Sequence, residues 1–405
     1  MNNSNDPTRD ISISARLGVL MAVPLSGLAQ SGLTPILPKL SEHFAEVPNA
    51  DAMVRLAVSG LSFAMIAGAL TGGFAGDRFG QRRVLIWALL IYALAGSAGF
   101  FLDNLYVIIG SRLLLGVVNA AAGIMVAALF TTRIGPQTRE KWLGFTVVAG
   151  TFGGILLFGL VGAVAKIDWR YVFLLHALAI PVALLIMAAL PASDQPAQSK
   201  HGSAETPRDG AADGLPIGLI LVGIACGAAA MGYMIFLPFH LKDVGHGEPH
   251  NVAGALMMSG FSGAVVSFGY GWLRQQWSAV PVFMLGFVII AAGLLVIGMM
   301  TDYVPILAGL ALVGGGVGLI GPNLFSASAA AAPPERRARS IGFARAGFYA
   351  GPLVAQLPLE PVVNQAGASG AMFVLSAFAI SMVAIITFCR QFLVPAAGEA
   401  IAVGH

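Results

Sequence analysis

Residues 73–83 read Gly-Phe-Ala-Gly-Asp-Arg-Phe-Gly-Gln-Arg-Arg, and they separate two apolar runs at residues 53–72 and 84–102. Each run is long enough to cross a bilayer as one helix. An aspartate and three arginines cannot lie in hydrocarbon, so the segment predicts the aqueous end of a helical hairpin. We expect a connection of about ten residues, in which the glycines allow a tight turn and close helix contact.

The polar and glycine positions of this segment follow the pattern G-x-x-x-D-R-x-G-x-R-R. They are Gly73, Asp77, Arg78, Gly80, Arg82 and Arg83. The pattern resembles the signature loop between spans 2 and 3 of the major facilitator superfamily of secondary transporters. The resemblance implies a conformational switch loop, in which the Asp77 carboxylate pairs with an arginine or with a helix N-terminus. The alternative is an ordinary short cytoplasmic loop, since such loops tend to be basic.

The composition is that of a membrane protein. Hydrophobic residues make up 57% of the 405 residues, charged residues only 10%, and the mean hydropathy is +0.82. A soluble domain has about 25% charged residues, so most of this chain is expected to face the lipid bilayer or neighbouring helices. The pI of about 9.0 then reflects topology rather than nucleic-acid binding. Cys226 and Cys389 fall inside apolar runs, where we expect packing residues rather than a disulfide.

At about 20 apolar residues per crossing, the sequence predicts an all-α integral membrane protein with twelve transmembrane helices, arranged as in the major facilitator fold. The expected spans are 14–38, 53–73, 83–102, 105–131, 142–165, 170–190, 215–240, 250–272, 280–300, 304–332, 341–363 and 370–392. Residues 191–214 are polar and rich in Ala, Ser, Pro and Gly, which is typical of a flexible linker. The predicted domains are an N-terminal six-helix bundle (1–190), a cytoplasmic linker (191–214) and a C-terminal six-helix bundle (215–405).

Lysine and arginine are distributed unevenly over the predicted connections. With the N-terminus inside, 15 of them lie in cytoplasmic segments and 5 in outer segments, which favours cytoplasmic positions for both termini. The first apolar run is too long for a cleavable secretion signal and is expected to stay as the first span. We therefore expect a monomeric, multi-pass protein of a bacterial inner membrane.

The two halves of the chain resemble each other. Gly73 corresponds to Gly269, with Leu273 in the place of Asp77, and Gly153 corresponds to Gly351. Parallel repeats at an offset of about 196–200 residues predict two bundles related by an axis along the membrane normal, with a binding site between them. The alternative is chance similarity among glycine-rich apolar helices.

Three residues are candidates for proton coupling: Arg112, His176 and Glu360. Arg112 lies about two turns inside the fourth predicted span, where an arginine needs a partner. Its Arg-x-x-x-Gly spacing resembles the fourth span of the superfamily, in which this arginine is associated with proton coupling; the alternative is a structural anchor. His176 is either a satisfied buried histidine or a titrating group. Glu360 is the only carboxylate placed within a predicted span, so uncoupled facilitation also stays open.

Two further segments resemble drug exporters of the superfamily. Residues 149–154 are similar to the G-P-x-x-G-G element, with Gly150 in place of the proline, and residues 168–173 are similar to the W-R-W-x-F boundary. By this resemblance the chain looks most like the twelve-span drug:proton antiporters. The implied function is proton-driven export of small, largely apolar organic compounds by alternating access.

Polar and aromatic residues at mid-depth in the predicted spans are the candidates for binding a small-molecule substrate. They are Gln30, Asn119, Phe152, Tyr233, Phe236, Asn323, Phe348 and Gln356. A buried amide is costly when it is unpaired, so each amide either lines a wet cavity or joins two helices. An apolar cavity with few charges argues against phosphorylated or strongly anionic substrates.

The sequence contains no phosphate-binding loop of the G-x-x-x-x-G-K type and no metal-type spacing of His or Cys. We therefore expect no enzymatic activity, no cofactor and no metal. His240, His246 and His250 fall in a predicted outer loop, where we expect them to be solvated. Two alternatives remain: an importer or facilitator of a specific metabolite such as an aromatic acid or sugar, and a transporter-like sensor, which the lack of an appended soluble domain disfavours.

Overall fold

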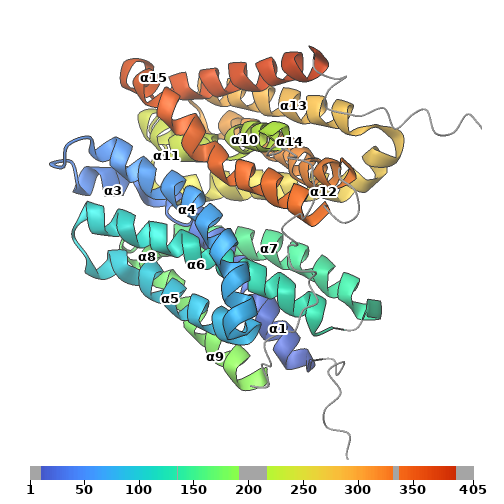
Figure 1. Ribbon diagram of the computed structural model, residues 1–405. Helices are drawn as coiled ribbons and strands as arrows, with labels where there is room; N and C mark the ends of the chain where they lie inside the picture. Colours follow the sequence, from blue (N-terminus) through green and yellow to red (C-terminus); the bar gives the residue numbers. More distant parts are fainter. Residues whose placement is uncertain (1–10, 135, 191–216, 332–336, 389–405) are drawn as a thin grey trace, which may run out of the picture. The chain divides into compact units, whose positions relative to one another are not determined.

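The computed structural model describes residues 11–134, 136–190, 217–331 and 337–388, and these residues form helices joined by short turns (Figure 1). Eleven of the described helical segments are long and apolar enough to cross a membrane. The last of them, Ser340–Thr387, has 48 residues and contains Gly367 at φ 69°, where the helix breaks and a second crossing begins. The prediction of twelve membrane-spanning helices is confirmed.

The chain divides into two compact units, residues 1–212 with 248–253 and residues 213–247 with 254–405. The helices of the first unit are α1 (Ile13–Met21), α2 (Val23–Ser31), η1 (Thr34–Ile36), α3 (Leu37–His43), α4 (Ala50–Phe79), α5 (Gln81–Phe101), α6 (Leu105–Thr132), α7 (Pro136–Val164), α8 (Tyr171–Leu174), η2 (Leu175–Leu178) and α9 (Ala179–Ala189). Those of the second are α10 (Ile217–Met231), α11 (Tyr233–Asp243), α12 (Pro249–Gln276), α13 (Ala279–Met299), α14 (Tyr303–Ala330) and α15 (Arg337–Phe388). The predicted linker 191–214 and Cys389 lie outside the described residues.

Several predicted spans are interrupted rather than continuous. The first crossing changes helix at Ala22, two residues before Pro24, and passes through a 3₁₀ turn at Pro35. The sixth changes from α8 to a 3₁₀ turn that contains His176, and then to α9. Proline removes a backbone donor and 3₁₀ turns tighten the chain, so both interruptions re-aim side chains inside the bundle.

The connection between α4 and α5 corrects one prediction. We expected about ten residues of loop, but α4 continues to Phe79 and α5 begins at Gln81, so Gly80 alone makes the turn. Gly80 adopts φ 90° and ψ 136°, a conformation that favours glycine. The charged residues extend the helices beyond the apolar runs, because a helix satisfies its own backbone at any depth, in lipid or in water.

Glycines allow α4 and α6 to approach each other at the backbone. A Cβ on Gly72 would lie 2.7 Å from the Ala121 Cα, and one on Gly76 would lie 2.6 Å from the Met125 Cε. The contact between Gly116 and the Leu61 carbonyl reappears in the second unit, 198 residues later, between Gly314 of α14 and the Ser259 carbonyl of α12. Such small-residue contacts are the usual means of helix association in lipid, and their shared register supports the predicted internal repeat.

Neighbouring glycines in α4 provide a test of this packing. Gly72→Ala should lower the free energy of unfolding by about 1–3 kcal/mol, because the new methyl group meets the α6 backbone. Gly73→Ala, where a Cβ has no neighbour within 4 Å, should be neutral or stabilising by up to about 1 kcal/mol, as expected for alanine in a helix. Unfolding by SDS titration in mixed micelles measures both. Equal effects of the two variants would contradict the proposed contact.

Candidate functional site

A buried cation lies at the centre of the first unit. The Arg112 side chain on α6 is 1% exposed. Its two terminal nitrogens contact the His176 Nε2 at 3.3 Å and the Gly96 carbonyl oxygen at 3.1 Å. The guanidinium also lies 4.9 Å from the centre of the Phe173 ring, a distance suited to a cation–π contact. Arg112 is therefore held by neutral groups, and its Nε has no hydrogen-bond partner within the described residues.

The hydrogen bonds of His176 assign its tautomer. The Nδ1 lies 3.0 Å from the Phe173 carbonyl oxygen, which can only accept, so Nδ1 carries the proton. The Nε2 faces the Arg112 guanidinium, which can only donate, so Nε2 is the acceptor. Both bonds form only when the imidazole is neutral. A second proton on Nε2 would place two donors face to face, beside a fixed positive charge.

The fold brings this pair together from distant parts of the chain. The 3₁₀ turn η2 directs His176 towards α5, where a Cβ on Gly96 would collide with it. One turn earlier on α5, Tyr92 packs against the His176 ring at 5.5 Å between centroids and donates its hydroxyl proton to the Leu25 carbonyl oxygen at 2.6 Å. Arg112 and His176 were predicted as separate candidates, and the structure places them in contact.

The amide candidates of the first unit also meet. The Asn119 Nδ2 donates to the Ser26 Oγ at 3.2 Å. The Gln30 Nε2 lies 3.3 Å from the carbonyl oxygen of Ser26 and 3.3 Å from its Oγ. Asn119 follows Arg112 by seven residues, or two turns of α6, and shares its face. Two polar clusters result, Gln30–Ser26–Asn119 and Tyr92–His176–Arg112, and these six residues together are here called the polar seam.

Candidates in the second unit fall into two groups. Tyr233 and Phe236 are fully buried on α11, and the Tyr233 hydroxyl lies 2.8 Å from the Ser259 Oγ. Phe348 and Gln356 lie on α15 and are 8% and 4% exposed.

The remaining aromatic candidate, Phe152 of α7 in the first unit, is 42% exposed, so it faces the surroundings of its own bundle.

Asn323 has a structural set of partners. Its Nδ2 donates to the Ala279 carbonyl oxygen at 2.8 Å, and its Oδ1 accepts from the Tyr270 hydroxyl at 3.3 Å. The side chain is fully buried and joins α14 to α12 and to the start of α13. These contacts support the helix-joining alternative for Asn323, while its predicted contact with substrate stays untested.

Glu360 is a half-buried carboxylate inside α15. Its Oε1 accepts a hydrogen bond from the Gln356 Nε2 at 2.9 Å, one helical turn away. Pro358 and Pro361 lie within the same helix, and each removes one backbone hydrogen bond. Two predicted residues of different roles, one for substrate and one for protons, are therefore in direct contact.

The predicted switch residues occupy a helix end rather than a loop. Asp77, Arg78 and Arg83 are exposed, and within the described part of the chain the Asp77 carboxylate forms no hydrogen bond or ion pair. Arg82 is half-buried and donates to the Met187 carbonyl oxygen at 2.7 Å, in the last turn of α9. A cation at a helix C-terminus is favourable, so Arg82 ties the start of α5 to the end of α9.

An ionic cluster joins the end of α3 to two connections of the first unit. The Asp103 carboxylate lies 2.6 Å from the His43 Nε2 and 3.1 Å from an Arg170 terminal nitrogen. The hydrogen bond from His43 and, to a lesser degree, the nearby positive charges lower the pKa of the exposed Asp103 carboxyl. Asp103 therefore stays ionised throughout the neutral range and is unsuited to carrying protons. Trp169, from the segment that resembles the exporter boundary, packs against the His43 ring.

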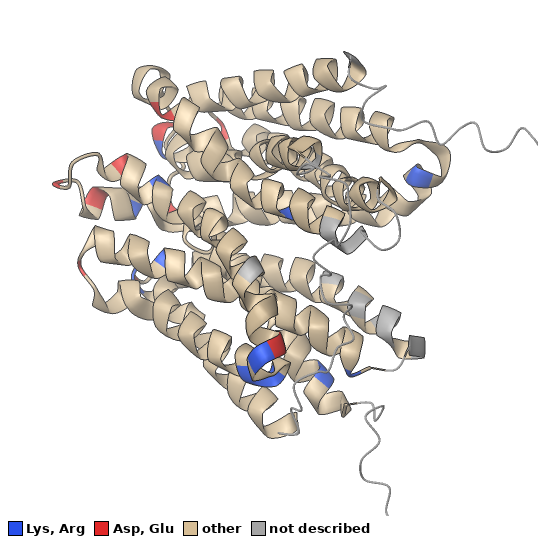
Figure 2. Ribbon diagram, in the orientation of Figure 1, with Lys and Arg blue, Asp and Glu red and all other residues tan. Residues whose placement is uncertain are grey.

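Charged residues cluster near the helix ends, with long uncharged stretches between them (Figure 2). Sequence reasoning missed Ser26 and Tyr92, whose only signal is a hydroxyl group within an apolar run. It also missed the burial of Arg55 on α4, where the side chain is 2% exposed. The prediction for His240 is wrong: it lies in the last turn of α11 and is 2% exposed, because α11 extends to Asp243.

Comparisons with known proteins agree with this architecture. Residues 19–356 match the family model described as Major Facilitator Superfamily. The inner membrane metabolite transport protein YdjE of Escherichia coli (strain K12) is 35% identical over 126 residues, which are 31% of this chain and only 28% of that protein. The Multidrug resistance protein B homolog of Mycobacterium tuberculosis (strain ATCC 25618 / H37Rv) is 23% identical over an alignment 396 residues long, which covers 82% of this chain and 72% of that protein.

Among solved structures, the inward-open xylose transporter XylE from E. coli superposes with a TM-score of 0.74. The alignment covers 95% of this chain and 97% of XylE at 14% sequence identity. At that identity the likeness concerns the fold alone.

A double-mutant cycle tests the contact between Arg112 and His176. Arg112→Met leaves the His176 Nε2 without a donor, and His176→Phe leaves one Arg112 nitrogen without an acceptor, so each should cost about 1–3 kcal/mol of unfolding free energy. The double variant should cost less than the sum of the two, by about 0.5–3 kcal/mol. SDS-titration unfolding of the four proteins measures this coupling.

The control cycle pairs His176→Phe with Arg83→Met, because Arg83 is exposed. Its two effects should be additive within about 0.5 kcal/mol. Additivity in the Arg112 cycle as well would show that the two side chains do not interact energetically.

Proposed function

Since the chain belongs to the Major Facilitator Superfamily, we propose that it is a proton-driven exporter of small, largely apolar organic compounds that works by alternating access. Membership of the superfamily and the twelve-helix fold support the role of a transporter. The substrate class, the direction of transport and the coupling to protons are what we propose. Its setting is the inner membrane of a bacterium, with a monomer whose termini are both cytoplasmic, as the lysine and arginine distribution favours.

The main observation in support of proton coupling is the hydrogen-bonded pair Gln356–Glu360 in α15. A coupling group has to be reached by water from either side in turn, and the half-buried Glu360 meets this condition better than the fully buried His176. The two prolines beside Glu360 weaken the local backbone ladder and favour the approach of water. The hydrogen bond from Gln356 gives the carboxylate a partner on the side of the proposed substrate residues.

The polar seam provides a second group that protons can affect. Protonating His176 would break its bond with Arg112, because Nε2 would change from acceptor to donor. A displaced Arg112 would need new partners in the same bundle. We propose that Glu360 carries the proton. Protonation of His176 would change how the helices around Arg112 pack.

The substrate class follows from the candidate residues themselves. They comprise amides, a phenol and phenyl rings, with no carboxylate or cation among them. Apolar compounds with a few hydrogen-bonding groups suit such a lining, whereas phosphorylated compounds require several convergent cations. The similarity to the M. tuberculosis multidrug resistance homolog supports export of this class.

A second candidate function is uptake or facilitated passage of a specific metabolite. The similarity to the E. coli metabolite transport protein supports it. Direction distinguishes the two functions: an exporter accumulates substrate in the compartment from which protons leave, and an importer accumulates it where protons arrive. A facilitator ignores the pH gradient.

Glu360→Gln should abolish accumulation driven by a pH gradient in proteoliposomes, while substrate binding changes by less than about threefold, because the amide keeps the shape of the side chain but cannot carry the proton. Asp302→Asn is the matched control, since Asp302 lies at the start of α14, outside the apolar part of the helix. A panel of dyes, antibiotics, sugars and aromatic acids supplies the substrates. Full gradient-driven accumulation by Glu360→Gln would remove Glu360 as carrier, and a wild type that ignores the gradient would favour the facilitator.

Asp77→Asn should slow transport about five- to a hundredfold without loss of membrane-inserted protein, because a charge-assisted contact that holds one conformational state would be lost. The exposed position of Asp77 in this structure suits a group that finds its partner in another state. Leu273→Asn, at the corresponding position of the second half, should have no comparable effect. Unchanged transport kinetics of Asp77→Asn would contradict the switch role.

A further inference from the structure

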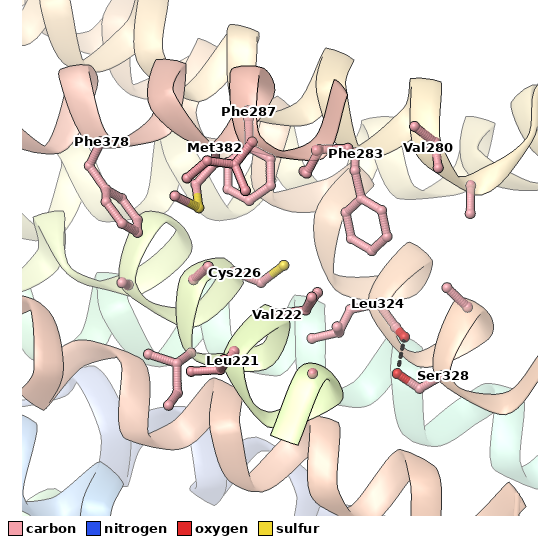
Figure 3. Close-up of a pocket in the computed structure, with 18 of the residues that line it drawn as sticks. Leu221, Val222, Cys226, Val280, Phe283, Phe287, Leu324, Ser328, Phe378 and Met382 are labelled. Atoms are coloured by element: carbon pink, nitrogen blue, oxygen red, sulfur yellow. Dashed lines mark hydrogen bonds between the residues drawn. The ribbon is translucent and has the colours of Figure 1, made fainter. Parts of the chain in front are cut away.

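The second unit contains a large apolar cavity among its own helices. Its volume is about 1140 Å³, and α10, α13, α14 and α15 supply most of its wall. Figure 3 shows Phe283 and Phe287 of α13, Phe378 and Met382 of α15 and Cys226 of α10 around this space. None of the predicted substrate or proton-coupling residues lines it. The volume exceeds the range of about 300–1,000 Å³ that is usual for drug-sized ligands.

The cavity is elongated along the helices. The part of α15 before the break at Gly367 contributes residues between Val354 and Leu359. After the break the lining runs from Val374 to Ile386, which is about 18 Å of helix. One leaflet of a bilayer core is about 15 Å deep, so the cavity has the length of a lipid acyl chain rather than of a compact ligand.

The rim of the cavity is apolar and exposed. Leu221, Val374 and Ile385 line it and are 57%, 42% and 49% exposed. A cavity of this kind gains nothing from water, since apolar cavities stay dry. Lipid tails are as apolar as leucine and surround a membrane bundle on all sides, so they are the available filling.

One end of the cavity carries a positive charge. Arg274 is the one charged residue among those that line it, and it lies near the end of α12, beside the short turn into α13. One of its terminal nitrogens donates to the Trp277 carbonyl oxygen at 2.8 Å. Among the described residues this is the one hydrogen bond of the side chain, so its other N–H groups can bind a ligand. Trp272 and Trp277 are exposed beside it, as expected at a membrane interface.

Two serines are the other polar residues of the wall, and Ser278 lies beside Arg274 in the turn before α13. The Ser328 hydroxyl donates to the Leu324 carbonyl oxygen at 2.7 Å, as drawn in Figure 3. The polar recognition is therefore concentrated at Arg274, next to the interface, and the remaining wall is hydrocarbon. An acidic headgroup with an attached acyl chain matches both features at once.

We propose that this cavity binds an anionic phospholipid, with its phosphate at Arg274 and an acyl chain between α10, α13 and α15. The lipid would fill a space that the helices leave unpacked and would hold α13 and α15 against α10. The site is separate from the proposed substrate residues, and it stands whether the protein exports or imports.

Native mass spectrometry of the purified, delipidated protein tests this assignment with two phospholipids of identical chains, phosphatidylglycerol and phosphatidylcholine. Phosphatidylglycerol should be retained about fivefold more strongly, as expected for one arginine near an anionic lipid. Arg274→Gln should remove this preference. Arg133→Gln, an arginine that follows α6 and does not line the cavity, should keep it.

Ala225→Phe places a ring in the cavity and should lower retention of both lipids, with the protein's monodispersity and helical content as a check on folding. Equal preference for phosphatidylglycerol in the wild type and in Arg274→Gln would overturn the proposal. So would unchanged lipid retention by a folded Ala225→Phe variant. Retention of an apolar dye but of neither lipid, lost in Ala225→Phe, would reassign the cavity to a small apolar ligand.

Discussion

Keeping the Arg112 guanidinium away from both water and lipid constrains the whole first unit. A charge in this position is costly unless several groups solvate it, and here a carbonyl oxygen, an imidazole nitrogen and an aromatic ring do so. Each contact depends on a local feature of the chain. Gly96 has no side chain to block His176, and the 3₁₀ turn η2 directs His176 inwards. Phe173 lies one turn before His176. Helices α5, α6 and α8 and the turn η2 are therefore fixed around one cation, and through Tyr92 the same cluster reaches α2.

The second unit repeats the packing but not the charge. The Gly116–Leu61 contact has a counterpart in Gly314–Ser259 at an offset of 198 residues, and at the same offset Arg112 corresponds to Leu310. Leu310 is fully buried. The two halves therefore share the glycines that allow close helix contact, but they differ in the side chains buried beside those contacts. The first half holds the polar seam, and the second holds Glu360 and an apolar cavity.

Much of the fold was predictable because hydropathy and charge in lipid leave few choices. The apolar runs predicted the membrane-spanning helices, and the charged segment at residues 73–83 predicted the helical hairpin. Its form was mispredicted, since charge places a residue in water but does not end a helix; only Gly80 has to leave helical geometry. The need of Arg112 for a partner also followed from the sequence, but its partner did not, because His176 lies 64 residues away and reaches it only through a 3₁₀ turn. The partners of Asn323 and the cavity at Phe283 depend on side-chain packing, which no periodicity records.

The neutral His176 that accepts a hydrogen bond from Arg112 is the central feature of this account, and nitrogen NMR of protein labelled with ¹⁵N-histidine measures it most directly. The His176 signals, identified by their loss in His176→Gln, should show a protonated Nδ1 and an unprotonated Nε2 at neutral pH. Arg112→Met should shift the Nε2 signal, because its donor is removed. An imidazolium, or a proton on Nε2 in the wild type at neutral pH, would contradict the arrangement around Arg112.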